Sequence, residues 1–105
     1  MTLDERIEIQ SPVRTAEADG SFVTSWEHFE SAWAKVEPLQ WRESEFSGQT
    51  QAIAEHRVTI RFLDGVVEGQ RIIRDNGMPF EVLRVAPTGT RRSWLQLLIK
   101  KDVRK

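Results

Sequence analysis

The stretch His56-Arg57-Val58-Thr59-Ile60-Arg61-Phe62 decides the fold. Val58, Ile60 and Phe62 alternate with polar residues, so an extended strand would place all three on one face, whereas a helix would scatter them. β-Branched and aromatic side chains also suit a half-buried pleated surface. The turn pair Asp64-Gly65 follows directly. We therefore predict that residues 56–62 form the central strand of a small sheet that closes on itself.

Residues 6–13 predict the first strand, because apolar residues alternate from Ile7 onward. We place this strand at the edge of the sheet, with an unpaired or bulged end, because Pro12 has no N–H to donate to a ladder. Ala18-Asp19-Gly20-Ser21 then predicts a turn. A second strand is expected to begin over residues 22–24.

The segment from Trp26 to Trp33 is ambiguous. Trp26, Phe29 and Trp33 have helical spacing, but apolar and polar residues alternate from Trp33 to Glu37. We favour a long strand that begins irregularly near Trp26, runs through Val36 and ends at Pro38, where the ladder loses a donor.

The C-terminal half predicts three more strands. Residues 70–74 form a short strand, and the pair Asn76-Gly77 predicts a two-residue hairpin loop with positive φ at both positions. Residues 80–85 form the second strand of this hairpin. The alternation of apolar and polar residues slips at Leu83, which indicates a bulge or burial on both faces. Residues 87–90 predict a turn, and residues 94–99 predict the last strand.

We therefore expect one mainly β domain over residues 1–105, because domains of about 100–150 residues are common. The spacing of strands and turns favours a small antiparallel β-barrel, or a sandwich, of about six strands. One long polar loop, residues 41–55, has room for a turn or two of helix before Gly48. Such long connections tend to be functional or mobile.

Composition argues against several classes of protein. The chain has no cysteine, which removes disulfides, zinc–thiolate sites and thiol catalysis, and its two histidines have no metal-ligand spacing. Catalytic and nucleotide-binding motifs are missing from the sequence. No apolar run approaches the ~20 residues of a membrane span, and the charged start does not resemble a signal peptide. We expect a non-enzymatic protein without metal, cofactor or membrane contact.

Charge is distributed unevenly along the chain. Residues 1–55 carry 11 acidic and 4 basic side chains, whereas residues 56–105 carry 5 acidic and 11 basic ones. These opposite charges either mate head to tail between identical subunits or cancel locally between neighbouring strands. Local cancellation is the favoured interpretation, although the pattern is compatible with self-association.

The tryptophans and arginines suggest a contact surface. One or two of the four tryptophans should belong to the core. The others could stack nucleic-acid bases if the arginines shared one face, but the net charge of −1 opposes this use. Anchoring of protein contacts fits better, because Trp and Arg are enriched at interfaces. The candidate interface residues are Trp26, Arg57, Arg61 and Arg91.

The order of segments resembles the phage head-tail joining family, small connector proteins also called stoppers or head-closure proteins. The matching segments are residues 6–10, 33–39, a polar stretch with Glu43 or Glu45 and Gln51, residues 56–62, Arg71-Ile72, Gly77 before Phe80-Glu81-Val82, and Leu95-Gln96-Leu97. They cover nearly the whole chain. Phe62 and Phe80 depart from the family, which often has tyrosine at these places.

This resemblance implies a β-barrel that assembles as a ring, commonly a dodecamer, in the virion neck after synthesis in the host cytoplasm. The ring would sit between portal and adaptor proteins and the tail, retain the packaged DNA and dock the tail. DNA would pass through the channel without sequence-specific binding. We expect the loop to face the channel or a neighbouring ring and to order on assembly. Its candidate residues are Trp41, Arg42, Glu43, Glu45, Phe46, Gln49 and Gln51.

Two other functions fit the sequence. A different virion ring protein, such as a tail terminator, would co-purify with tail tubes rather than with filled heads. A small OB-like nucleic-acid-binding barrel would bind single strands in a salt-sensitive way.

Overall fold

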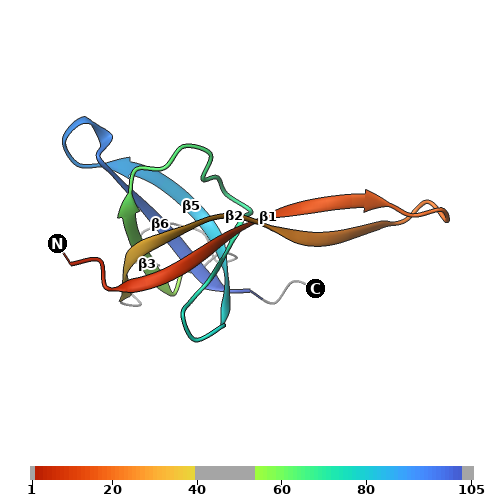
Figure 1. The fold of residues 1–105 in the computed structure, drawn as a ribbon, viewed down its shortest axis with the longest axis horizontal. Helices are drawn as coiled ribbons and strands as arrows, with labels where there is room; N and C mark the ends of the chain where they lie inside the picture. Colours follow the sequence, from red (N-terminus) through yellow and green to blue (C-terminus); the bar gives the residue numbers. More distant parts are fainter. Residues whose placement is uncertain (1, 40–53, 103–105) are drawn as a thin grey trace.

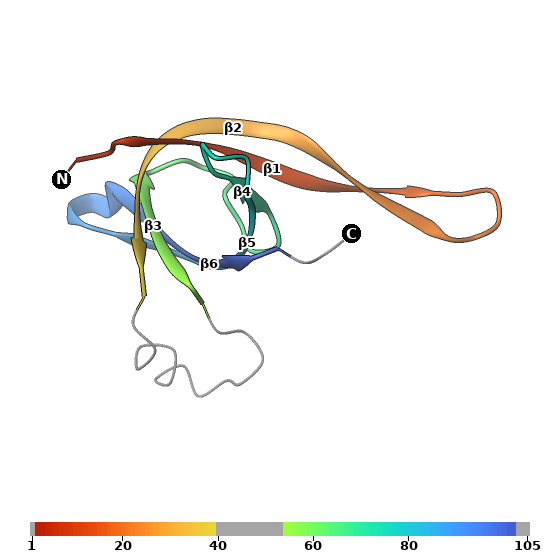
Figure 2. The same cartoon turned by 90° about the horizontal axis from the view of Figure 1, so that it is seen from below.

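The computed structural model describes residues 2–39 and 54–102 as six strands in a single closed antiparallel barrel. The strand order around the barrel is β1-β2-β3-β6-β5-β4, and β4 pairs with β1 to close it, as Figure 2 shows. The prediction of a mainly β, six-stranded barrel is therefore confirmed. The elements are β1 Glu5–Ala16, β2 Phe22–Pro38, β3 His56–Arg61, β4 Arg71–Ile73, β5 Pro79–Thr88, the 3₁₀ turn η1 Thr90–Arg92 and β6 Trp94–Lys101.

The core lies inside the barrel and follows the predicted alternation. In β6, for example, Leu95, Leu97 and Ile99 are buried while their neighbours are partly exposed. Every strand contributes at least one side chain, because a small barrel has an interior just wide enough for side chains to fill it. The buried apolar residues are Ile7, Ile9, Ala34, Val58, Ile60, Val66, Ile72, Phe80, Val82, Leu95, Leu97 and Ile99.

The central strand is shorter than predicted. Val58 and Ile60 are fully buried as expected, but β3 ends at Arg61 and the Phe62 side chain is 49% exposed. The pairing of β3 with β2 stops at the Ala34–Ile60 pair, after which the chain diverges from β2. The expectation that Phe62 shares the core face was therefore wrong, because the residue lies beyond the last rung of the ladder.

The ambiguous segment belongs to a strand. β2 is 17 residues long, and β1 pairs with it from Ala16–Phe22 to Glu5–Ala34. The helical spacing of its aromatic residues is therefore incidental. Beyond the barrel, these two strands continue as a two-stranded ribbon that projects from the body (Figure 1). We call residues 11–27, the ribbon and its turn, the arm.

β1 is not the edge strand that Pro12 suggested. Over Glu8–Gln10 it pairs with β2 on one side and with β4 on the other. A bulge follows Ile9, and Pro12 lies in the arm, two residues beyond Gln10, the last residue of β1 that pairs with β4. A proline is tolerated there because the outer edge of the arm needs no ladder donor.

The second hairpin has a three-residue loop rather than the predicted two-residue loop. Arg74 and Met78 face each other across it, and the Gly77 N–H donates to the Arg74 carbonyl (2.8 Å). Gly77 has φ +83°, whereas Asn76 is not among the residues with positive φ. This pattern fits a turn that ends in a left-handed glycine. The Asn76 side chain instead accepts a hydrogen bond from the Met78 N–H (2.9 Å).

Sequence irregularities in β5 have structural counterparts. The predicted slip is a bulge at Leu83, where the register with β6 shifts between Val82 and Arg84. The turn predicted at residues 87–90 begins later, because β5 continues through Thr88 opposite Trp94.

Candidate assembly surfaces

The tip of the arm exposes apolar side chains to solvent. Phe22 is 60% exposed and Val23 is 48% exposed, although both lie in a paired strand. The guanidinium of Arg14 covers part of the Phe22 ring at 4.5 Å from its centroid. Phe22 and Val23 are neighbours on a ribbon that has no core of its own to bury them, so the tip is a candidate docking element.

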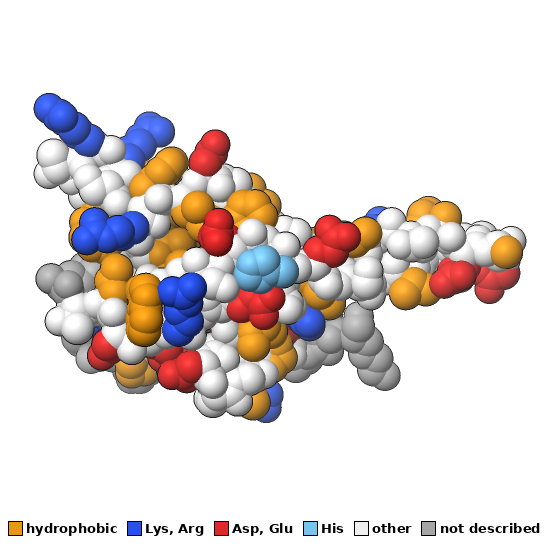
Figure 3. All heavy atoms as spheres, viewed as in Figure 1, with side chains coloured by type: hydrophobic (Ala, Val, Ile, Leu, Met, Phe, Trp, Pro, Cys, Tyr) orange, Lys and Arg blue, Asp and Glu red, His pale blue; other side chains and the backbone are white. Residues whose placement is uncertain are grey.

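The turn of the arm is acidic and locally ordered. The Asp19 carboxylate accepts hydrogen bonds from the Ser21 hydroxyl (2.7 Å) and the Ser21 N–H (3.0 Å). These bonds favour the ionised form and lower the pKa of Asp19. The tip therefore presents a negative charge beside its apolar side chains, and Figure 3 shows acidic groups gathered at this end of the molecule.

An apolar groove opens where β3 diverges from β2. Its volume is about 330 Å³, and the aromatic rings of Trp33 and Phe62, each about half exposed, contribute to its walls. We call it the aromatic groove. Its lining residues are Leu3, Glu30, Ser31, Ala32, Trp33, Arg61, Phe62 and Leu63.

The groove also borders an open stretch of β2. Among residues 2–39 and 54–102, β3 pairs with β2 only from Ala34 onward, so residues 30–33 have no strand beside them on that edge. The Ser31 N–H donates to the carboxylate of its neighbour Glu30 (N–Oε1 3.2 Å). The groove therefore combines apolar walls with a strand edge and a carboxylate.

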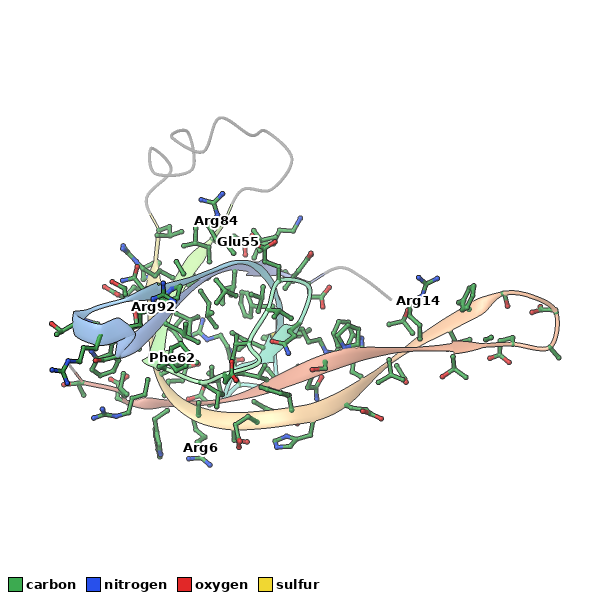
Figure 4. The ribbon with its side chains drawn as sticks, turned by 90° about the horizontal axis from the view of Figure 1, so that it is seen from above. Arg6, Arg14, Glu55, Phe62, Arg84 and Arg92 are labelled. Carbon is green, nitrogen blue, oxygen red and sulfur yellow. The ribbon has the colours of Figure 1, made fainter. Side chains whose placement is uncertain are left out.

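A second cleft, of about 270 Å³, is lined in part by Leu39, which follows β2, and by Ala54, which precedes β3. Arg57 and Arg84 contribute its charged groups. Figure 4 shows Arg84 and Glu55 on this side of the barrel. The other lining residues are Ala86, Gln96 and Leu98.

The expectation of one or two core tryptophans fails for the described residues. Trp26 and Trp94 are half-buried and Trp33 is 52% exposed, so none belongs to the core. Each ring has an arginine over it instead: Arg71 at 4.4 Å from Trp26, Arg6 at 5.5 Å from Trp33 and Arg61 at 5.0 Å from Trp94. The barrel is narrow and filled mostly by aliphatic side chains, with Phe80 as its one described aromatic core residue, so these three tryptophan rings lie outside and pack under guanidinium groups.

The four predicted interface residues do not converge on one patch. Trp26 lies in the arm, Arg57 lines the second cleft, Arg61 lines the aromatic groove and Arg91 lies in η1. Their role at an interface stays a prediction. The predicted loop residues, Trp41, Arg42, Glu43, Glu45, Phe46, Gln49 and Gln51, lie outside the described residues.

Sequence reasoning missed three exposed aromatic residues, namely Phe22, Trp33 and Phe62. Alternation cannot distinguish a ring that faces the core from one that faces solvent beyond the end of a ladder. One signal was present at Phe22, because a phenylalanine directly after a polar Asp-Gly-Ser turn lies at a hairpin tip, where the core cannot reach it.

Two carboxylates of β1 make side-chain pairs with other parts of the barrel. Glu5 pairs with Arg74, and Glu8 Oε2 lies 2.7 Å from His28 Nδ1. These hydrogen bonds lower the pKa of both carboxylates.

Among the described residues, no group of three or more His, Cys, Asp or Glu side chains could hold a metal ion. That part of the chain also has no helix long and apolar enough to cross a membrane.

Comparison with known proteins now places this fold. The chain is similar to protein SF1141 from Shigella flexneri 2a, a solution structure with 25% sequence identity and a TM-score of 0.77 over 98% of this chain and 96% of that one. It also resembles a chain in the virion of a native gene transfer agent particle, with 16% identity and a TM-score of 0.65 over 99% of both chains. No curated protein sequence matches it significantly.

The comparison with protein families agrees with the resemblance drawn from the sequence. The family model described as phage head completion protein matches residues 1–102, which is nearly the entire chain. This family consists of structural virion proteins rather than enzymes. The chain therefore belongs to the phage head completion protein family.

Proposed function

We propose that this protein closes the DNA-filled phage head as a connector ring in the virion neck. The ring, a dodecamer by analogy with head-closure connectors, lies between the portal and adaptor proteins and the tail. It retains the packaged DNA, which passes through the channel without sequence-specific binding, and it docks the tail. The chain is made in the host cytoplasm before it joins the particle.

The observation that carries this proposal is the family match over residues 1–102. A fold shared with a chain of a gene transfer agent virion supports it. The shape of the molecule is also suitable, because a small barrel with a long arm can contact a neighbour while its body forms the wall of a ring. The molecule measures 49 × 30 × 28 Å, and the arm extends along the longest dimension (Figure 1).

The experiment uses DNA-filled heads produced without this protein. Heads that lack the connector should leak DNA, which a nuclease-protection assay measures, and adding the purified chain should restore protection and tail attachment. Electron microscopy of the repaired heads should show a ring beneath the portal and adaptor proteins. Heads that retain DNA and bind tails equally well without the chain would contradict the proposal.

The same samples separate the two other functions. Recovery of the chain on tail tubes, but not on heads, would indicate a tail terminator. Salt-sensitive retention of single-stranded DNA by the free chain, seen as an electrophoretic shift, would indicate a nucleic-acid-binding barrel.

A further inference from the structure

We propose that the arm tip of one copy docks in the aromatic groove of a second copy, with Phe22 inserted beside Trp33 and Phe62. This inference rests on the proposed ring and names the contact that would join its subunits. The groove and the tip are both apolar surfaces that the chain leaves exposed. No described residue fills the groove in a single copy.

The groove has room for the side chain. A cavity of about 150 Å³ lined by aliphatic and aromatic groups can hold a benzene ring. The aromatic groove, at about 330 Å³, is large enough for the Phe22 ring and part of the backbone that carries it. Aromatic side chains in such pockets are typical anchors of protein interfaces.

The strand edge offers a second point of attachment. Residues 30–33 of β2 lack a neighbour on the groove side among the described residues, and residues 22–24 of the arm are extended. An extended segment can add to an exposed strand edge through main-chain hydrogen bonds, while alternate side chains enter pockets. Phe22 and Thr24, which share a face of the strand, would then point toward the groove.

Charges at the two surfaces are complementary. Arg14 lies against the Phe22 ring, so docking of that ring brings a guanidinium to the groove, where the Glu30 carboxylate lies. The acidic turn around Asp19 would in the same way approach Arg61, which lines the groove. Opposite charges across an interface favour its formation and fix its register.

The contact cannot form within one chain. Glu30 pairs with Ile9, whereas Arg14 lies five residues further along β1, a separation of about 17 Å at ~3.3 Å per residue. Figure 4 shows Arg14 on the arm and Phe62 on the opposite part of the molecule. A contact between two different surfaces of identical subunits is head to tail, and it forms a closed ring when its rotation closes.

Cysteine cross-linking tests the contact directly, because the chain has no cysteine of its own. The double variant Thr24→Cys, Ser31→Cys places one thiol beside Phe22 and one in the groove. Oxidation or a short bismaleimide should produce a ladder of linked chains, both in the free protein at high concentration and in assembled particles. In the control pair Val67→Cys, Ser31→Cys, one cysteine lies outside both surfaces, so no ladder should form.

Removal of the anchor should abolish this ladder. Phe22→Ser should weaken self-association about thirtyfold, the effect expected for a hot-spot aromatic residue. Val67→Ser removes an apolar side chain of similar exposure, 56%, and should leave self-association unchanged. A ladder that persists in the Phe22→Ser background, or no ladder in either the free chain or particles, would overturn the proposal.

A charge exchange provides an independent readout. Arg14→Glu and Glu30→Arg should each reduce the ladder, and the two changes combined in one chain should restore it. Because the two residues are far apart within one chain, such rescue reports a contact between copies. Failure of rescue, with both single variants folded, would exclude this register of docking.

These results separate the contact from the function on which it rests. If the variants with a damaged tip or groove still protect DNA in filled heads and still form rings, the head-closure function stands and the docking proposal fails. If the ladder forms as expected but the chain neither protects heads nor appears in the neck, the contact stands and the proposed function fails.

Discussion

The guanidinium of Arg74 donates two hydrogen bonds to the carboxylate of Glu5, from Nε to Oε2 at 2.8 Å and from Nη2 to Oε1 at 2.9 Å. This pair joins β1 to the β4–β5 hairpin, at the seam that closes the barrel. The backbone ladder at this seam has only three residue pairs, from Glu8–Ile73 to Gln10–Arg71. Side chains therefore extend the closure beyond the reach of the short β4.

Replacement of Glu5 by Gln should destabilise the fold by about 1–3 kcal/mol, because it leaves the mostly buried Arg74 without its charged partner. The Glu5 and Arg74 side chains are only 13% and 22% exposed. Chemical denaturation measures the difference. The matched control is Glu37→Gln, in an exposed pair with Lys35 at 4.0 Å, which should change stability by less than about 0.5 kcal/mol. Equal effects of the two substitutions would contradict a structural role of the seam.

The same pair predicts a dependence of stability on pH. The hydrogen bonds from Arg74 lower the pKa of Glu5 in the folded state. Its contribution is therefore fully present above the unfolded pKa of about 4.3 and is lost as pH falls through the lower folded pKa. Unfolding free energies measured between neutral and acidic pH should fall less steeply for Glu5→Gln than for the wild-type chain. Parallel curves would show that Glu5 does not titrate as the structure indicates.

Gln70 should be a sensitive position, because its side chain is buried and makes three hydrogen bonds. Its Oε1 accepts from the Val67 N–H (3.0 Å), and its Nε2 donates to Ser11 Oγ (3.0 Å) and the Gly65 carbonyl (3.2 Å). Gln70→Leu should cost about 1–3 kcal/mol, because backbone groups lose their partners. Ser11→Ala removes one of the three bonds and should cost less. Hydrogen exchange should show faster exchange of the Val67 amide in Gln70→Leu alone.

Gly65 should resist substitution more than Gly20 does. Both have positive φ, +92° and +90°, but a Cβ at Gly65 would lie 2.8 Å from Cζ of Phe29, whereas nothing lies within 4 Å at Gly20. Gly20→Ala should cost about 1–2 kcal/mol from backbone conformation alone, and Gly65→Ala clearly more. In a double-mutant cycle measured by thermal unfolding, Phe29→Ala should relieve part of the extra cost. If the effects of Gly65→Ala and Phe29→Ala are additive, the cost of Gly65→Ala comes from the backbone conformation and not from contact with Phe29.

Ile60 and Phe62 should differ in what they support. Ile60 is fully buried in β3, so Ile60→Ala should cost about 2–5 kcal/mol. Phe62 is half exposed at the aromatic groove, so Phe62→Ala should cost less than about 1 kcal/mol in denaturation. Self-association should show the opposite order. Phe62→Ala should weaken it more than Ile60→Ala does, when both variants are compared in the folded state. A large loss of stability in Phe62→Ala would show that this ring packs in the core, which would contradict its exposed position.

The charge pattern of the sequence has two outcomes in the structure. The pair of Glu5 with Arg74 joins the acidic and basic halves of the chain within one molecule, as local cancellation predicts. The arm places Asp19 far from the groove that Arg61 lines, which leaves unlike charges on separate surfaces. Sequence counts could not separate these cases, because they do not record which strands are neighbours.

The sequence by itself determined the all-β class, most strands and most of the core, because the period-two alternation of side chains is a local property that burial inside a barrel then selects. It also indicated the irregularity at Leu83, as a bulge or as burial on both faces, and the head-closure family. Only the tertiary structure decided where pairing stops. The pairing of β1 with β4 stops at Gln10, and the pairing of β2 with β3 stops at Ala34. These two limits create the arm and the aromatic groove. The end of a ladder depends on where distant strands diverge, and no local pattern encodes that distance.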